Sequence, residues 1–129
     1  APPEHRGKGP LAGLAAGLEG VQAGGRVAFA PCDMPLLDGG IYRALLQVIE
    51  NAPGAYAETT DGLEPLVAIL DAGTRPVLVQ ALARGELPRT HAVLDEAGAV
   101  RVMFEDQRAF TNINAPADLD AYLPRPYEG

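Results

Sequence analysis

The chain has 129 residues, of which 47% are hydrophobic, so it is long enough for one domain with a buried core. Its formal net charge is −7, with one lysine and nine scattered arginines, which argues against DNA or RNA as a partner. No apolar run approaches the roughly 20 residues that a membrane span needs. The single cysteine, Cys32, excludes an intramolecular disulfide and fits a reducing compartment. We therefore expect a cytoplasmic protein.

Hydrophobic periodicity divides the chain into helices and strands. Apolar residues at three- and four-residue spacing predict a helix over 9–24. A short apolar run predicts a buried parallel strand over 26–30. The later segments follow from the same patterns: a helix over 39–51, strands over 54–59 and 63–70 with a turn between them, helices over 75–84 and 87–95, a strand over 100–105 and a last helix over 116–123.

This alternation of helices and strands predicts an α/β fold, specifically a three-layer α/β/α sandwich with a mostly parallel sheet. Residues 1–129 form a single domain in this interpretation, because no linker divides them. No strand precedes the first helix, although ligands in open α/β sheets lie at the carboxyl ends of strands. We therefore expect that an N-terminal strand and its glycine-rich loop are missing from this sequence.

The first segment that can carry chemistry is the glycine-rich turn from Gly7 to Gly13. Glycines at the start of a helix let backbone N–H groups approach a phosphate or a base, and the helix dipole favours negative charge there. The spacing is neither that of a dinucleotide fingerprint nor that of a Walker A loop. Taken alone, this segment is better explained by close helix packing, which Gly13 and Gly17 would permit.

The second segment runs from Pro31 to Leu37, directly after the predicted strand over 26–30. Asp33 would lie at the carboxyl end of that strand, where a carboxylate can hold Mg²⁺ while phosphates and waters fill the remaining positions. A role as a turn or capping residue remains open for Asp33. Cys32 has no His or Cys partner at ligand spacing, so we interpret it as a small buried hydrophobic residue.

The third segment contains Asn112 and Asn114, whose amides point the same way if the stretch is extended. Uncharged amides suit a pterin, a base or a metal-bound phosphate, although turn and capping chemistry is the better explanation of these asparagines taken alone. Glu64, which precedes Pro65 and Leu66 at the start of a strand, is ambiguous from its position alone.

Four ordered motifs together resemble the molybdenum cofactor guanylyltransferases, which belong to the Rossmann-like nucleotidyltransferases. These motifs are Gly9-Pro10-Leu11-Ala12-Gly13, Cys32-Asp33-Met34-Pro35, Glu64-Pro65-Leu66 and Asn112-Ile113-Asn114-Ala115-Pro116-Ala117-Asp118-Leu119. The resemblance extends over most of the chain, from Gly9 to Leu123. Related cytidylyltransferases and sugar-nucleotide enzymes share the aspartate loop, so the order and spacing of the motifs carry the comparison.

The resemblance implies a reaction in which the phosphate of molybdopterin is joined to the α-phosphorus of GTP and pyrophosphate is released. It implies that Asp33 is the catalytic, Mg²⁺-binding aspartate, that the turn from Gly9 through Pro10, Leu11 and Ala12 to Gly13 lines the nucleotide pocket, and that Asn112 and Asn114 lie near the pterin and the phosphate. The expected partners are GTP and molybdopterin, together with chaperones of molybdoenzymes, and neither nucleic acid nor a membrane.

Two departures from the family pattern keep alternatives open. The opening glycine-rich loop with its Arg and Lys is absent, and so is the Asp that usually precedes the Gly-Pro-Leu turn. The alternatives are a related cytidylyltransferase, a nucleotidyltransferase acting on a sugar phosphate or another cofactor precursor, and a non-catalytic remnant of the same fold.

Overall fold

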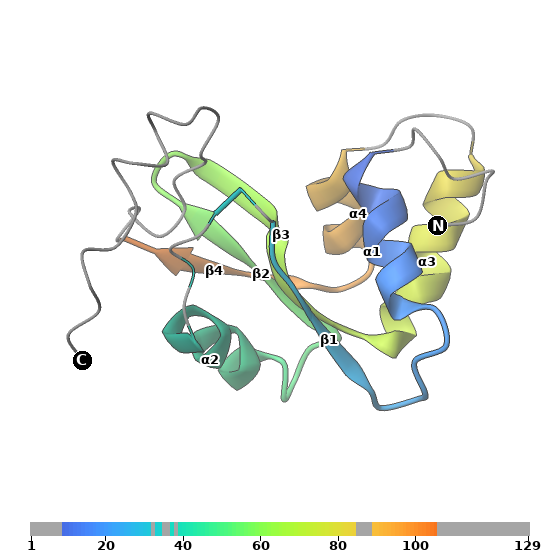
Figure 1. The fold of residues 1–129 in the computed structure, drawn as a ribbon, viewed down its shortest axis with the longest axis horizontal. Helices are drawn as coiled ribbons and strands as arrows, with labels where there is room; N and C mark the ends of the chain where they lie inside the picture. Colours follow the sequence, from blue (N-terminus) through green and yellow to red (C-terminus); the bar gives the residue numbers. More distant parts are fainter. Residues whose placement is uncertain (1–8, 32, 35–36, 38, 85–88, 106–129) are drawn as a thin grey trace.

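The computed structural model describes residues 9–31, 33–34, 37, 39–84 and 89–105 (Figure 1). Its elements follow one another in the order α1 (Pro10–Leu18), β1 (Arg26–Phe29), α2 (Gly39–Val48), β2 (Gly54–Thr59), β3 (Gly62–Asp71), the 3₁₀ turn η2 (Ala72–Thr74), α3 (Arg75–Ala83), α4 (Thr90–Glu96) and β4 (Val100–Phe104). The mixed α/β class predicted from the sequence is confirmed. Within the described residues, no helix combines the length and apolarity that crossing a membrane requires.

The four strands form one sheet in the order β1-β3-β2-β4. β3 pairs antiparallel with both β1 and β2, while β2 and β4 pair in parallel. β1, β2 and β4 therefore point the same way, and β3 runs against them between β1 and β2.

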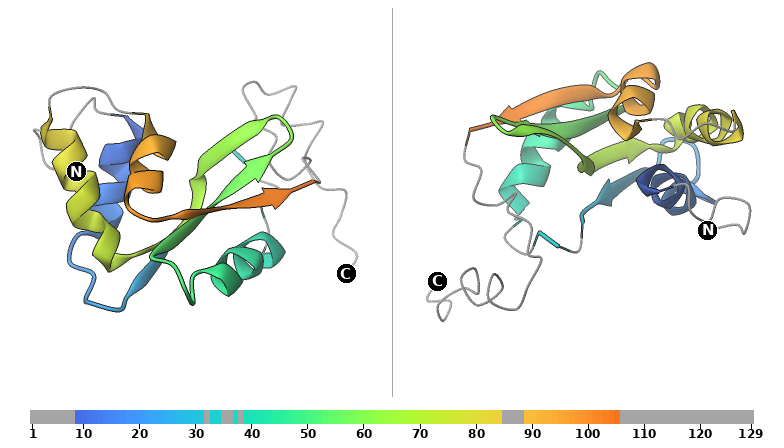
Figure 2. Two further views of the ribbon diagram at one scale, coloured as in Figure 1. Left: turned by 180° about the vertical axis from the view of Figure 1, so that it is seen from behind. Right: turned by 90° about the horizontal axis from the view of Figure 1, so that it is seen from above.

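Helices cover both faces of this sheet (Figures 1 and 2). Alternate residues of a strand point to opposite faces. Tyr56, Ala68 and Leu70 accordingly pack against α1, α3 and α4 on one face. Ala55, Val67 and Ile69 pack against α2 on the other face.

The apolar stripe predicted on the first helix through Leu11, Leu14, Ala15, Leu18 and Val21 is confirmed for the first four, which are all buried, whereas Val21 lies beyond the helix and is half-buried. The helix ends at Leu18 instead of continuing to residue 24. The next residue, Glu19, has an extended backbone, and Gly20 follows with φ of 79°, in the left-handed region that favours glycine at a helix end.

The prediction of a mostly parallel sheet is not confirmed for the described strands, since two of their three pairings are antiparallel. Only Thr60 and Asp61 separate β2 from β3. A connection of two residues joins antiparallel strands, whereas a parallel pair needs a long crossover.

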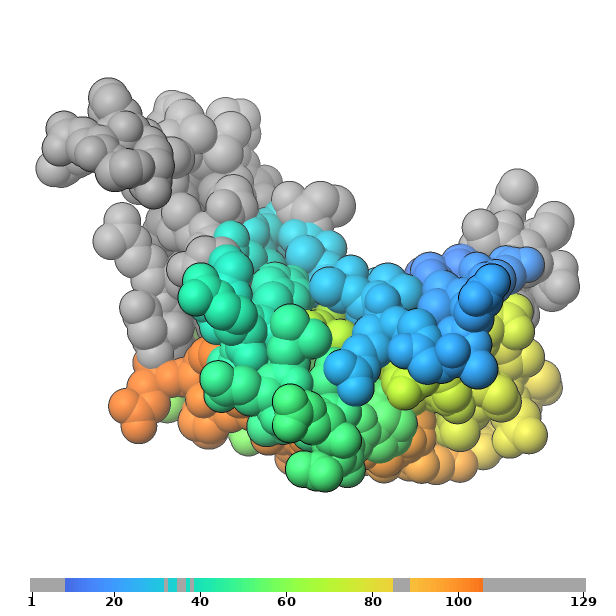
Figure 3. Space-filling model, turned by 90° about the horizontal axis from the view of Figure 1, so that it is seen from below, coloured from blue at the N-terminus to red at the C-terminus, as the bar shows by residue number. Residues whose placement is uncertain are grey.

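The strand predicted over 26–30 is present as β1, but among the described residues it is neither fully buried nor parallel to its neighbour. Within the described residues it pairs with β3 alone, in antiparallel register. Its residues alternate between exposed and half-buried. β1 and the segment before it lie beside α2 on the face shown in Figure 3, where the Arg26 guanidinium donates a hydrogen bond to the Ile49 carbonyl oxygen.

The remaining predicted elements agree with the structure to within a few residues at their ends. α4 begins at Thr90, three residues after the predicted start, and the strand predicted over 63–70 extends by one residue at each end. The predicted helix over 116–123 and the residue Cys32 lie outside the described residues.

Candidate functional site

Helix α1 begins at the glycine-rich turn that the sequence predicts to bind a nucleotide. Gly9 precedes the helix with φ of 70° and ψ of −154°, a conformation that residues with a Cβ rarely adopt. Pro10 occupies the first helical turn, where its fixed φ suits the helix and its missing N–H is not needed. Gly9 has no side chain that could cap the first N–H groups, so a phosphate or water can approach them.

The five residues predicted to line the nucleotide pocket divide between the protein core and a cavity. Leu11 and Ala12 are 1% and 4% exposed and belong to the core against α3 and α4. Pro10 and Gly13 line the cavity. Gly13 is exposed, and a Cβ added to it would meet no atom of the described residues within 4 Å.

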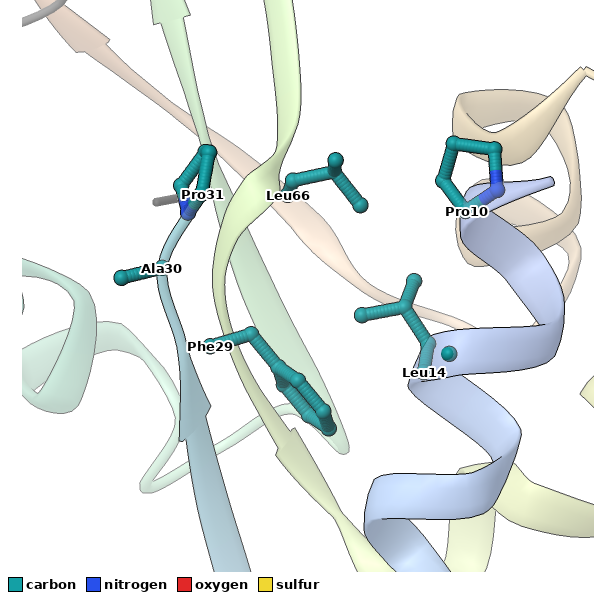
Figure 4. Close-up of a pocket in the computed structure, with 7 residues that line it drawn as sticks. Pro10, Leu14, Phe29, Ala30, Pro31 and Leu66 are labelled. Carbon is teal, nitrogen blue, oxygen red and sulfur yellow. The ribbon is translucent and has the colours of Figure 1, made fainter. Parts of the chain in front are cut away.

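The cavity has a volume of about 280 Å³ and lies between α1, the end of β1 and β3. Figure 4 shows the rings of Pro10 and Phe29 and the side chains of Leu14 and Leu66 around this space. The complete set of lining residues is Pro10, Gly13, Leu14, Phe29, Ala30, Pro31 and Leu66. No titratable side chain is among them, so the walls suit the apolar faces of a ligand.

Two interactions hold the backbone at the end of β1, beside the cavity. Phe29 pairs with Ala68 in the antiparallel ladder with β3. The hydroxyl of Tyr42 on α2 donates a hydrogen bond of 2.6 Å to the Phe29 carbonyl oxygen. Burial raises the pKa of Tyr42 above its ordinary value, so the hydroxyl stays protonated and able to donate. The strand end is thus fixed from both sides.

Asp33 follows this strand end, as predicted, and it is half-buried. The Met34 N–H donates to the Pro31 carbonyl oxygen at 3.4 Å, which closes a turn around Asp33. Pro31 lines the cavity, whereas Met34 is 5% exposed and packs into the core against α2. Along the chain, Asp33 therefore lies between Pro31, which lines the cavity, and Met34, which is buried in the core.

Glu64 on β3 lies close enough to Asp33 for the two carboxylates to interact electrostatically. Burial raises the pKa of Glu64 above its ordinary 4.5, and the negative charge of Asp33 raises it further. Glu64, whose role is ambiguous from the sequence, thus lies in the same environment as Asp33, the predicted catalytic aspartate.

An irregularity in β3 positions Glu64 and Leu66. Tyr56 pairs with Ala68, but the next residue of β2, Ala57, pairs with Glu64. The three residues between these partners, 65–67, form a bulge that contains Pro65. Proline within a sheet is normally confined to edges and bulges, because it cannot donate to the ladder. Leu66 in the bulge reaches the cavity, and Glu64 at its margin reaches the vicinity of Asp33.

The residues around Asp33 fit a hard divalent cation in their chemistry. Magnesium prefers oxygen ligands, and it is often held by one or two carboxylates with substrate phosphates and water. Two neighbouring carboxylates repel each other, and a bound cation relieves that repulsion. Across the part of the chain that the structure describes, no group of three or more His, Cys, Asp and Glu side chains could hold a metal. Such an ion would be completed by further ligands beyond Asp33 and Glu64, such as substrate phosphates and water.

The third predicted motif cannot be placed beside this cavity. Asn112 and Asn114 lie outside the described residues, as do Cys32 and Pro35 of the aspartate motif. The structure thus brings together parts of three motifs, through Pro10 and Gly13, Pro31 and Asp33, and Glu64 and Leu66.

Several cavity residues are absent from the site predicted from the sequence. Pro31 and Leu66 belong to, or adjoin, recognised motifs, so their nearness to the site could have been inferred. Phe29 is the last residue of a strand, and strand ends are where α/β sheets form their sites. Leu14 carried no functional signal, because its spacing is that of an ordinary core residue.

Two solved structures share this fold. The molybdopterin-guanine dinucleotide biosynthesis protein A of Archaeoglobus fulgidus aligns with a TM-score of 0.69 at 23% identity, covering 86% of this chain and 59% of that one. A protein of Aquifex aeolicus VF5 aligns with a TM-score of 0.69 at 20% identity, covering 82% of this chain and 56% of that one. The described residues therefore share the α/β fold of these two proteins.

Sequence comparison identifies the family. Residues 1–106 match the MobA-like NTP transferase domain, and the chain belongs to that family. It is 36% identical over 115 residues to the molybdenum cofactor guanylyltransferases of Yersinia pestis (strain Pestoides F) and Yersinia pseudotuberculosis (serotype O:1b). This alignment covers 88% of the chain but 58% of each relative, so the chain spans little more than half their length. The resemblance seen in the sequence motifs is confirmed.

Proposed function

We propose that the protein containing this chain transfers GMP from GTP to the phosphate of molybdopterin and releases pyrophosphate. The observation that carries the proposal is the 36% identity to molybdenum cofactor guanylyltransferases over 88% of the chain. The convergence of parts of three motif segments at and beside one cavity supports it.

In this proposal the cavity receives the apolar faces of the nucleotide. Leu14, Phe29 and Leu66 would contact the base and the ribose, and Gly13 would leave room for them, because no described residue comes close to the place where its Cβ would lie. The start of α1 would favour the negatively charged phosphates through its N–H groups and its dipole. The chain's own contribution is thus to orient the nucleotide.

Asp33 and Glu64 would hold Mg²⁺ beside the phosphates, with Asp33 as the principal ligand. Magnesium, when bound, neutralises charge that develops on phosphate oxygens during phosphoryl-type transfer. Glu64 would add a second oxygen ligand, directly or through water. Asn112 and Asn114 would contact the pterin or its phosphate. No covalent nucleophile is required for such a transfer.

The proposal also covers the fold, the partners and the location of the whole protein. We propose a three-layer α/β/α sandwich, of which the described sheet and its two helical layers form a part. The net charge of −7 supports small-molecule partners over nucleic acid. The proposed location is the cytoplasm, where molybdoenzyme chaperones would be further partners.

The direct test is a turnover assay of the complete protein with molybdopterin, Mg²⁺ and GTP, CTP or ATP in parallel. We expect turnover with GTP, and we expect Asp33→Asn to lower it by about 100-fold or more with little effect on folding. Glu50→Gln is the control, because Glu50 is an exposed acid beyond the end of α2.

Each other outcome identifies an alternative. Preferential use of CTP would make the protein a cytidylyltransferase. Absence of turnover and of Mg²⁺-dependent nucleotide binding would indicate a non-catalytic member of the fold. Near-normal turnover by Asp33→Asn would contradict the assigned role of Asp33.

A further inference from the structure

Gly17 and Phe29 are in unusually close contact across the space between α1 and β1. A Cβ added to Gly17 would lie 2.5 Å from Phe29 Cε1 and 2.9 Å from Phe29 Cζ. Real Cβ atoms essentially never come within 3.0 Å of such neighbours. Glycine at position 17 is therefore what allows the Phe29 ring to lie against α1.

The backbone on both sides of this contact is held in place. Phe29 is fixed by its pairing with Ala68 and by the hydrogen bond from Tyr42 to its carbonyl oxygen. On the other side, α1 is anchored by buried residues that pack in the core with α3 and α4. These residues are Leu11, Ala12, Leu14, Ala15 and Leu18.

A methyl group at position 17 would consequently move the Phe29 ring rather than the elements that carry it. Swinging an aromatic ring changes one or two side-chain dihedral angles, whereas moving β1 breaks hydrogen bonds of the ladder. The Phe29 ring also borders the cavity of about 280 Å³, which offers open space next to it (Figure 4). The displaced ring would enter that cavity.

We infer that Gly17 is a positioning residue for the nucleotide cavity, which it keeps open through the Phe29 ring without touching the ligand. This inference rests on the proposed function, since that proposal assigns the cavity to the nucleotide. Gly17 does not line the cavity, and only its contact with Phe29 connects the two.

The test compares Gly17→Ala, Phe29→Leu and the double variant in the complete protein by titration with Mg²⁺ and GTP. Leucine lacks the Cε1 and Cζ atoms that cause the clash, and the remaining contact at Cδ1, 3.7 Å away, is ordinary. We expect Gly17→Ala to weaken GTP binding by about tenfold or more, which corresponds to about 1.4 kcal/mol. In the Phe29→Leu background, Gly17→Ala should change GTP affinity by less than about threefold.

A second measurement tests the inference independently of nucleotide binding. In NMR spectra of protein with labelled phenylalanine, nuclear Overhauser contacts should place the Phe29 ring near position 17 in the wild type. In Gly17→Ala they should shift to Leu66 and Pro10. If the wild type binds no GTP but the ring shifts as expected, the proposed function fails and the steric control of the cavity stands.

Three results would overturn the inference. One is a Phe29 ring that keeps its position in Gly17→Ala. Another is a loss of GTP affinity on Gly17→Ala that is as large in the Phe29→Leu background as in the wild-type background. The third is failure of both Gly17→Ala and the double variant to fold, because the clash would then not be confined to the ring.

Discussion

The hydroxyl of Tyr56 on β2 donates a hydrogen bond of 2.5 Å to a carboxylate oxygen of Asp95 on α4. Arg101 on β4 completes the cluster, donating from Nε to the Tyr56 hydroxyl at 2.9 Å and from Nη2 to Asp95 at 2.7 Å. The Tyr56 side chain is fully buried, and burial followed by the bond to Asp95 raises its pKa to about 12. The cluster therefore ties α4 to the parallel pair of strands.

We expect Tyr56→Phe to lower the free energy of unfolding by about 1.5 kcal/mol, because the lost hydrogen bonds join charged groups. Tyr42→Phe is the matched control. It removes a hydroxyl that donates to the uncharged Phe29 carbonyl, so its cost should be nearer to about 1 kcal/mol. Urea denaturation of both variants measures the two values. A cost for Tyr56→Phe that is well below that of Tyr42→Phe would show that the cluster adds no stability.

The Asp95 carboxylate makes the stability of the folded protein depend on pH in the acidic range. The hydrogen bond from Arg101, followed by that from Tyr56, lowers the pKa of Asp95 below its ordinary 3.8. A carboxylate with a lowered folded-state pKa stabilises the fold above its unfolded pKa, and that contribution is lost as the pH falls through the folded value. The stability difference between wild type and Asp95→Asn should therefore shrink as the pH drops below 3.8.

The measurement is urea denaturation of wild type and Asp95→Asn at a series of pH values. Glu96→Gln is a suitable control in this series. Glu96 is paired with Arg84 at 3.0 Å, but both side chains are about half exposed, so water screens the pair. The Glu96 variant should differ little from wild type at any pH. A pH-independent effect of Asp95→Asn would show that the effect of the variant comes from altered packing.

The extent to which the sequence predicts this fold depends on how local each signal is. The stripe through Leu11, Leu14 and Leu18 is a local repeat, and it locates α1 correctly. The predicted end of that helix is too late, although Gly20, which has a positive φ in the structure, is itself a stop signal in the sequence. The parallel strand direction is not confirmed for the described strands, and the predicted turn at Asp61-Gly62 already favours an antiparallel pair because it is so short.

In the candidate site, too, some features follow from local sequence motifs and others depend on the tertiary structure. Asp33 and the turn from Gly9 to Gly13 follow from motifs that are continuous in the sequence. The link between Asp33 and Glu64 does not, because it depends on a bulge that shifts the register of β3 against β2. Pro65 was the one available sign of that bulge, since proline rarely fits a regular inner strand.

Glu64 should titrate above its ordinary pKa of 4.5 in metal-free protein. A carboxyl whose folded pKa is raised destabilises the fold once it ionises, so its effect appears as the pH rises above 4.5. Glu64→Gln should therefore make the protein more stable than wild type at neutral pH in the presence of a chelator. NMR titration of the Glu64 carboxyl carbon measures the pKa directly.

The same titration in Asp33→Asn separates the two causes. Removing the charge of Asp33 should lower the Glu64 pKa only in part, because burial is the larger cause. Added Mg²⁺ should lower it in the wild type if the two carboxylates share the ion. A Glu64 pKa that responds to neither change would remove Glu64 from the proposed magnesium site.

Gly13→Ala is expected to stabilise the protein and to weaken its binding of GTP. Gly13 lies inside α1, where replacing glycine by alanine adds about 0.5–1 kcal/mol of stability. The added methyl meets no atom of the described residues within 4 Å, but it projects from a residue that lines the cavity. Thermal unfolding without and with Mg²⁺ and GTP measures both effects. Stabilisation by the nucleotide should be smaller in the variant, because that stabilisation falls as the dissociation constant rises. If Gly13→Ala gains stability yet binds GTP as tightly as wild type, the nucleotide does not occupy the space beside Gly13, and the assignment of the cavity is wrong.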